Sequence, residues 1–266
     1  MAEEKNVILT GTSSGMGEAT ALYLSQRGYR VFGGNLPEKE GPVGPSLSTH
    51  SLDIQKSESV ARFVSEVAHP VYALINNAGF ALAGAVEETS LEEGQRQLET
   101  NFYGMVRLCK EVIPHMRKQG SGRIINTSSG AAVAGGPFHA FYSASKFAVE
   151  GFTEALRHEL RPFGIHVSIL QPGCFRTSVV ENAHSSKLQI EEYTQERERC
   201  LEALQKYNRE APDPVKVARL LFHILQKRKP ALRYRIGTDV TMSSLLRRFL
   251  PESWYQALVA DYYKVR

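Results

Sequence analysis

Residues 7–17 read Val7-Ile8-Leu9-Thr10-Gly11-Thr12-Ser13-Ser14-Gly15-Met16-Gly17, a short apolar run followed by a turn with three glycines. The apolar run predicts a buried strand, and the apolar residues after Gly17 predict a helix that ends near Gly28. Glycines let the chain turn tightly and approach a ligand closely, while free N–H groups at the helix start attract an anion. The stretch therefore predicts a phosphate-binding turn. Its GxxxGxG spacing differs from the commoner GxGxxG, so a turn whose glycines serve geometry alone is the alternative.

The alternation of strand and helix continues outward from this turn. Apolar runs predict further strands at residues 29–34, 49–52, 71–75, 122–127, 165–170 and 232–236. Helical patterns lie between them, the longest predicted as one helix over residues 91–118 with Pro114 near its end. This order predicts an α/β fold: a doubly wound parallel sheet with helices on both faces and a ligand at the carboxyl ends of the strands. The chain has no repeat or linker-like segment, so we expect a single domain over residues 1–266.

The composition is that of an ordinary globular protein of 266 residues, 42% hydrophobic and 23% charged. A formal net charge of +4, without a continuous basic block, does not favour nucleic acid as a partner. Three widely spaced cysteines with no CxxC pair predict reduced thiols, and we expect neither disulfides nor a metal site. The polar start and the lack of a long apolar run predict a cytoplasmic protein.

The stretch Tyr142-Ser143-Ala144-Ser145-Lys146 carries a chemical signal. On a helix, Tyr142 and Lys146 lie one turn apart on the same face. A phenol has a free pKa of about 10, and a neighbouring ammonium lowers it toward the range useful for proton transfer. The same spacing also occurs when a packed ring stands beside a solvated amine, so the pair alone does not establish a catalytic site.

Several polar residues follow the predicted strands. Asn35 stands where dinucleotide-binding folds commonly carry an acid that holds a ribose, and the lack of that acid permits a 2′-phosphate. Asp53 could accept a hydrogen bond from an adenine amino group or cap the next helix. Asn101 lies in a helix among apolar neighbours, so it either faces solvent or has a specific partner. Ser128 and Ser129 stand at the end of the fifth strand.

Taken together, these motifs resemble the short-chain dehydrogenase/reductase family over residues 7–177. They appear in the family's order: Thr10-Gly-x-x-x-Gly-x-Gly17, Asn76-Asn-Ala-Gly79, Asn101, Ser129, Tyr142-x-x-x-Lys146, and Pro172-Gly173 followed by Thr177. The resemblance implies a Rossmann-type fold and an NAD(P)(H)-dependent oxidoreductase that transfers hydride between nicotinamide and a secondary alcohol or carbonyl. By analogy with members that act on steroids and retinoids, it also implies an apolar substrate.

The resemblance implies roles for four residues. Tyr142 would exchange a proton with the substrate oxygen, and Lys146 would lower the pKa of Tyr142 and hold the nicotinamide ribose. Ser129, whose spacing from the tyrosine fits the family better than that of Ser128, would donate to the carbonyl oxygen. Asn101 would hold a water molecule that joins Lys146 to solvent.

The resemblance also implies a larger set of residues for the dinucleotide. They are Gly11, Thr12, Ser13, Ser14, Gly15, Met16, Gly17, Asn35, Asp53, Ile54, Asn77, Ala78, Gly79, Tyr142, Lys146, Pro172, Gly173 and Thr177. Neither the acid typical of NAD users nor the arginine typical of NADP users follows the second strand. The missing acid favours NADP(H), with NAD(H) as the alternative.

The segments after Thr177 differ in character from the rest. Residues 181–211 are highly charged, with apolar residues at near-helical spacing. This pattern predicts either a mobile helical lid over the substrate or an ordinary amphipathic surface helix. The tail, residues 243–266, mixes aromatic and aliphatic residues with two arginines. We expect it to pack on the body or on a partner subunit rather than on a membrane surface.

Two further expectations concern partners and the main alternative. The family analogy implies a homodimer or homotetramer formed through the helices at residues 91–118 and 142–161, acting on a small-molecule alcohol or ketone. A catalytically silent relative that binds dinucleotide as a sensor or scaffold is the alternative. We favour the enzyme because a silent relative would be expected to lose the tyrosine or the lysine, and this chain keeps both.

Overall fold

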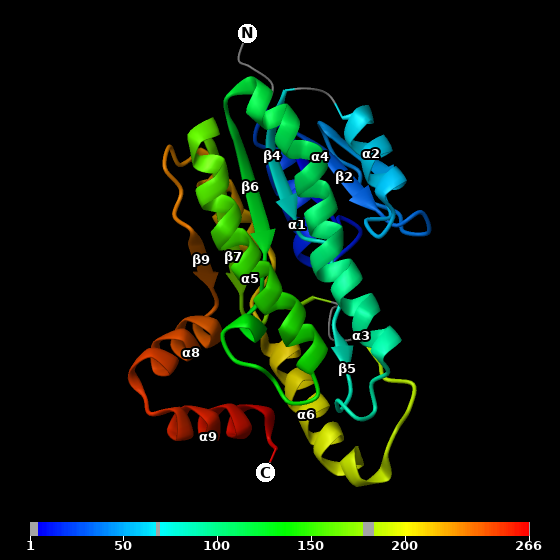
Figure 1. Cartoon of the computed structure of the whole chain (residues 1–266), viewed down its shortest axis with the longest axis vertical. Coiled ribbons are helices and arrows are strands. Elements are labelled where there is room, and N and C mark those ends of the chain that lie inside the picture. Colours follow the sequence, from blue (N-terminus) through cyan, green and yellow to red (C-terminus); the bar gives the residue numbers. More distant parts are fainter. Residues whose placement is uncertain (1–4, 68–69, 178–183, 266) are drawn as a thin grey trace.

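The computed structural model describes residues 5–67, 70–177 and 184–265. Within them, seven parallel strands form one sheet in the order β3-β2-β1-β4-β6-β7-β9 (Figure 1). The strands are β1 (Lys5–Thr10), β2 (Tyr29–Asn35), β3 (Leu47–Ser51), β4 (Val71–Asn76), β6 (Gly122–Thr127), β7 (Ile165–Pro172) and β9 (Arg233–Ile236). The prediction of a doubly wound parallel sheet is therefore confirmed.

Alternating side chains of the strands fill two apolar cores, one on each face of the sheet. The helices are α1 (Gly15–Ser25) and α7 (Val215–Gln226) on one face, and α2 (Ser57–Glu66), α4 (Gly104–Gln119) and α5 (Ala140–Leu160) on the other. Val7 and Leu9 of β1 pack toward α1 and α7, whereas Ile8 packs toward α2, α4 and α5. Successive side chains of a strand point to opposite faces, so a continuous apolar run is buried on both.

The helical segment predicted over residues 91–118 is confirmed, because residues 91–119 are helical without a gap, but it contains a wider turn that the sequence did not predict. Between α3 (Leu91–Leu98) and α4 runs η1 (Glu99–Tyr103), a π-helical turn that contains Asn101. The side chain of Asn101 is bonded to the backbone of Phe80, a partner outside the helix. Such wider turns inside α-helices often mark functional positions. Helix α4 continues past Pro114 without ending there.

The remaining elements gather mainly beyond the carboxyl ends of the strands, where the arrowheads in Figure 1 point. They are the short strands β5 (Leu82–Ala83) and β8 (His184–Ser185), η2 (Gly130–Ala132), α6 (Glu191–Glu210), α8 (Thr238–Phe249) and α9 (Glu252–Tyr263), with η3 (Arg161–Phe163) following α5. Residues 181–183 of the predicted lid lie outside the described residues, and the rest of it forms β8 and the single helix α6. In the described part of the chain, no helix is both long and apolar enough to span a bilayer.

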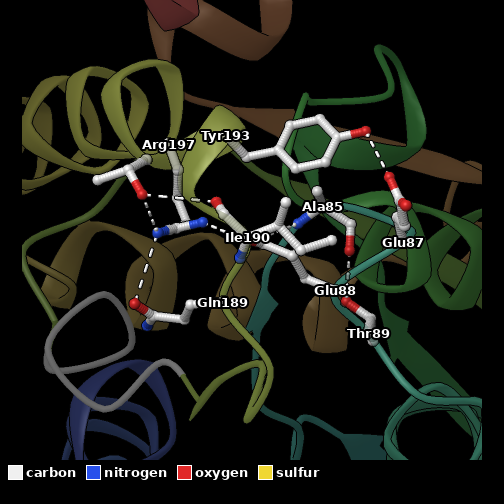
Figure 2. A network of polar contacts seen from close by, with 9 residues as sticks. Ala85, Glu87, Glu88, Thr89, Gln189, Ile190, Tyr193 and Arg197 are labelled. Atoms are coloured by element: carbon white, nitrogen blue, oxygen red, sulfur yellow. Dashed lines mark hydrogen bonds and ion pairs between the residues drawn. The ribbon is translucent and has the colours of Figure 1, made fainter.

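A buried ion pair fixes the start of α6 to the segment after β5 (Figure 2). Glu88 accepts hydrogen bonds from the backbone N–H groups of Ala85 and Ile190, each at 2.9 Å, and pairs with the guanidinium of Arg197. Glu88 is 1% exposed and Arg197 6%. Burial alone would raise the pKa of Glu88, but its hydrogen bonds to both backbone groups and its contact with Arg197 lower it. The carboxylate therefore joins α6 to the body at a point remote in sequence.

We expect Glu88→Gln to lower the free energy of unfolding by about 3 kcal/mol, because Arg197 would keep its charge in a buried position without a counter-charge. Urea unfolding at neutral pH measures this loss. Glu87→Gln is the matched control, since Glu87 is exposed and bonded to Tyr193 at 3.0 Å; its loss should stay below about 1 kcal/mol. Equal losses in the two variants would contradict a special role for the buried pair.

Candidate active site

The glycine turn forms a cradle that leaves no room for larger residues. Gly11 has a φ of +71°, and a Cβ there would lie 2.9 Å from the Cα of Ala78. A Cβ on Gly17 would lie 1.9 Å from the carbonyl oxygen of Gly11, so only glycine permits this approach of helix and strand. Helix α1 begins at Gly15, and the Ser14 side chain makes no capping hydrogen bond. Free N–H groups at this helix start suit a phosphate, so the cradle fits a dinucleotide.

Thr10 and Asn77 tie this cradle to the turn after β4. The Thr10 hydroxyl oxygen accepts from the backbone N–H groups of Asn77 and Ala78, each at 3.0 Å. The Asn77 amide donates to the carbonyls of Thr10 at 3.1 Å and Gly11 at 3.2 Å. The predicted turn at residues 77–79 therefore lies against the glycine cradle. The backbone N–H groups of Asn77 and Ala78 and the side-chain amide of Asn77 all donate to groups of the protein. A contact between this turn and a dinucleotide stays a prediction.

Asn35 lies at the predicted strand end but is bonded to the protein itself. Its Oδ1 accepts from the backbone N–H of Thr12 at 2.7 Å and from the Thr12 hydroxyl at 3.1 Å. The Asn35 side chain thus braces the glycine turn from β2. The buried Nδ2 has no hydrogen-bond partner within the described residues. An aspartate at this position could accept the same two hydrogen bonds from Thr12. Asparagine and aspartate would therefore differ here in charge and not in their contacts with the turn.

Asp53 and Ile54 make contacts within the protein. Asp53 accepts from the backbone N–H of Gln55 at 3.0 Å and pairs with Lys56 at 3.3 Å. These contacts lie in the turn before α2, whose N-cap is Lys56 and carries no side-chain capping bond, so the alternative that Asp53 caps this helix is wrong; an adenine contact stays a prediction. The Ile54 side chain is buried in the core beside Gly104. Any role for Ile54 toward a dinucleotide therefore falls to its backbone.

Ser129, Tyr142 and Lys146 meet at the carboxyl end of β6. Lys146 donates from Nζ to the carbonyl oxygen of Thr127 at 3.0 Å, and its Nζ lies 5.8 Å from the centroid of the Tyr142 ring. A hydrogen bond joins the side chains of Ser129 and Tyr142. The Ser128 hydroxyl instead lies 3.5 Å from the carbonyl oxygen of Lys146. Of the two serines, the structure brings Ser129 to the tyrosine.

The sequence left open whether Asn101 faces solvent or has a specific partner, and the structure shows a specific partner. Its Oδ1 accepts from the backbone N–H of Phe80 at 3.0 Å, and its Nδ2 donates to the Phe80 carbonyl at 3.0 Å and to Ser145 at 3.1 Å. A Cβ on Gly79 would lie 2.9 Å from the Asn101 Oδ1 and 3.8 Å from the Lys146 Nζ. Asn101 therefore fixes the turn that separates it from Lys146, and a bridging water stays a prediction.

The pKa values correct one expectation about the tyrosine. Burial raises the pKa of Tyr142 above its usual value, and the hydrogen bond from Ser129 lowers it only in part. Lys146 was expected to lower the pKa of Tyr142, so the predicted net direction is wrong for the protein as it stands. Burial also lowers the pKa of Lys146 to about 8, because the charged form loses its hydration. Near neutral pH the pair is therefore a protonated phenol beside an ammonium.

Thr177 lies over the glycine cradle and is held by a residue that the sequence did not single out. A Cβ on Gly15 would lie 3.2 Å from the Thr177 side chain. Asn208 of α6 bonds to both the N–H and the carbonyl of Thr177. At the end of β7, Gly173 donates to the Ile236 carbonyl at 2.8 Å, and a Cβ on it would meet the Asp239 carboxylate. Residues from later in the chain therefore hold Thr177 and Gly173 in place.

The C-terminal helix α9 also reaches the site. The phenol oxygen of Tyr263 would lie 2.6 Å from a Cβ on Gly136. Burial raises the pKa of Tyr263, and the proximity of Cys200 and Tyr142 raises it further. The ring of Tyr262 stacks on that of Tyr207 of α6 with centroids 4.6 Å apart. The structure thus places the tail on the body; its aromatic content was the only sequence signal for this contact.

Comparisons with known proteins agree with this arrangement. A family model described as short chain dehydrogenase matches residues 5–188. A 3-ketodihydrosphingosine reductase from Bacteroides thetaiotaomicron is 37% identical over 265 residues, which cover 98% of each chain. Human retinol dehydrogenase 8 is 38% identical over 184 residues, which cover 65% of this chain and 59% of that protein. A crystal structure of a short-chain dehydrogenase from Streptomyces avermitilis covers 99% of this chain and 98% of its own, with a TM-score of 0.82 and 27% identity. The protein is therefore a member of the short-chain dehydrogenase family of NAD(P)-dependent oxidoreductases.

Proposed function

We propose that this protein interconverts a ketone and a secondary alcohol on a long-chain apolar substrate, with NADP(H) as cofactor and Tyr142 as the proton donor and acceptor. One observation carries the proposal: Ser129, Tyr142 and Lys146 meet at the sheet edge that also holds the glycine cradle. The turn containing Ala78 and Gly79 links the two, since Ala78 packs on Gly11 and Gly79 lies beside Lys146.

The chemistry follows from what each side chain can hold. A bound nicotinamide dinucleotide supplies or accepts the hydride. In reduction, Tyr142 gives its proton to the carbonyl oxygen, and the Ser129 hydroxyl stabilises the negative charge developing there. The raised pKa of Tyr142 keeps the phenol protonated near neutral pH, as a proton donor must be. The charged Lys146 then stabilises the phenolate left behind.

An apolar substrate is supported by one relative and by the aromatic residues near Tyr142. The bacterial relative matched over nearly the whole chain is a reductase of 3-ketodihydrosphingosine, a long-chain ketone. Here Tyr263 lies near Tyr142, and its neighbour Tyr262 stacks on Tyr207 of α6, so aromatic side chains beside the site support an apolar substrate. The first assay is therefore the oxidation of NADPH by 3-ketodihydrosphingosine, beside a panel of shorter apolar ketones and aldehydes.

The preference for NADP(H) is argued from charge at the end of β2. Asn35 and Leu36 stand there, and neither would repel a 2′-phosphate. Solved structures of similar fold hold either cofactor, among them a short-chain dehydrogenase from Burkholderia phymatum with NAD and one from Burkholderia cenocepacia with NADP. Both are 24% identical to this chain, with TM-scores of 0.80 and 0.74, so they support the fold alone. The preference for NADP(H) over NAD(H) is therefore inferred from the residues at the end of β2.

Tyr142→Phe is expected to lower kcat for ketone reduction by about a thousandfold, since the proton donor is removed, with little change in the affinity for NADPH. Steady-state kinetics and a fluorescence titration with NADPH measure the two effects. Tyr103→Phe, an exposed tyrosine of η1, is the control and should keep wild-type turnover. If Tyr142→Phe lost cofactor binding together with turnover, the residue would be structural and the proposed role would be wrong.

Asn35→Asp is expected to weaken NADPH binding at least about tenfold relative to NADH, because a carboxylate there would repel the 2′-phosphate. The isosteric change keeps an acceptor for both Thr12 contacts, but it buries a carboxylate whose second oxygen has no donor, so circular dichroism first checks that the variant folds. Parallel fluorescence titrations with the two reduced cofactors measure the ratio of dissociation constants. A ratio equal to that of the wild type would show that Asn35 does not set the preference.

A further inference from the structure

The last turn of α6 carries a buried amide whose two ends are both bonded to one backbone residue. Asn208 is 5% exposed, and its Oδ1 accepts from the N–H of Thr177 at 3.3 Å. Its Nδ2 donates to the carbonyl of Thr177 at 2.9 Å. A carboxamide is well suited to this double contact because it offers an acceptor and a donor side by side. The position of Thr177 therefore depends on a side chain 31 residues later in the chain.

The segment that contains Thr177 lies between the end of α6 and the glycine cradle. The neighbouring Arg176 donates its backbone N–H to the carbonyl of Pro212 at 3.0 Å and pairs with Asp213 at 3.8 Å. Both partners lie in the connection from α6 to α7. On its other side, the Thr177 side chain lies over Gly15, the first residue of α1. Residues 176 and 177 thus form a contact between the end of α6 and the start of α1, where the proposed function places a phosphate.

The other end of α6 is fixed separately, on the substrate side. Arg197 is paired with Glu88 near its start (Figure 2), and the buried Cys200 lies with its Sγ 3.7 Å from the Pro137 carbonyl. Pro137 belongs to the loop that leads into the helix of Tyr142. A single helix therefore contacts the loop beside the tyrosine from its middle and, through Thr177, the glycine cradle from its last turn.

We propose that Asn208 is a positioning residue for the dinucleotide, which acts through the backbone of Thr177 and couples the cofactor site to α6. This proposal rests on the proposed function, since it needs a dinucleotide in the cradle. Coupling of this kind is reciprocal: if α6 positions Thr177 for the cofactor, bound cofactor stabilises α6 to the same extent. Neither effect requires Asn208 to touch the cofactor.

The test compares NADPH affinity in three variants by fluorescence titration. Asn208→Ala should weaken binding about tenfold, because both hydrogen bonds to Thr177 are lost. Gln205→Ala, an exposed amide on the same helix, should bind as the wild type does. Glu88→Gln loosens the opposite end of α6 but keeps both contacts to Thr177, so it should weaken NADPH binding less than Asn208→Ala does; an equal loss would mean that general loosening of α6, and not the hold on Thr177, is the cause.

A second measurement uses the wild-type protein alone, so the test does not depend on the folding of a variant. Hydrogen exchange of peptides covering residues 200–210 in the wild type should slow when NADPH binds. If Asn208→Ala binds NADPH as tightly as the wild type, or if wild-type α6 gains no protection, the coupling is wrong while the proposed function stands. If the wild type binds neither NADPH nor NADH, both proposals fail.

Discussion

The burial of the Lys146 ammonium is the constraint on which the chemistry of this fold depends. The side chain is 5% exposed, and the Thr127 carbonyl at the end of β6 accepts its hydrogen bond. A charge removed from water is costly unless it is hydrogen-bonded, and the cost appears here as a pKa lowered to about 8. The same burial raises the pKa of Tyr142. A lysine in solvent would be too well hydrated to act strongly on a neighbouring phenol. The burial that makes the charge on Lys146 costly therefore also strengthens its electrostatic effect on Tyr142.

Where the sequence signals were local, they predicted the structure. The apolar runs placed β1, β4, β6 and β7 because nearly all residues of these strands are buried between the two faces of the sheet, and the glycine turn predicted the cradle because only glycine fits there. The π-helical turn at Asn101 was not predicted, since the partner of Asn101, the backbone of Phe80, is brought to it only by the fold. The pKa of Tyr142 was predicted in the wrong direction for a similar reason: the lysine can be counted in a sequence, but the burial of the phenol cannot.

Residues that connect distant segments were the least accessible to sequence reasoning. Asn208 is one polar residue among many in a charged helix, and its partner Thr177 precedes residues 178–183, which are not described. Tyr263 lies near the chain end, and the fold alone brings it to the loop beside Tyr142. Glu88 and Arg197 form their pair across more than a hundred residues. These contacts give α6 and α9 a fixed place over the carboxyl ends of the strands.

The most direct test of the central claim is the pH dependence of kcat for ketone reduction with saturating NADPH, from about pH 6 to about pH 10. Tyr142 stays protonated over most of this range, because its pKa is raised, so the loss of charge on Lys146 governs the profile. We predict a constant rate at low pH that falls as pH rises through about 8, the pKa of Lys146, since a neutral amine no longer stabilises the phenolate. A rate that stays level or rises across pH 8 would contradict the account.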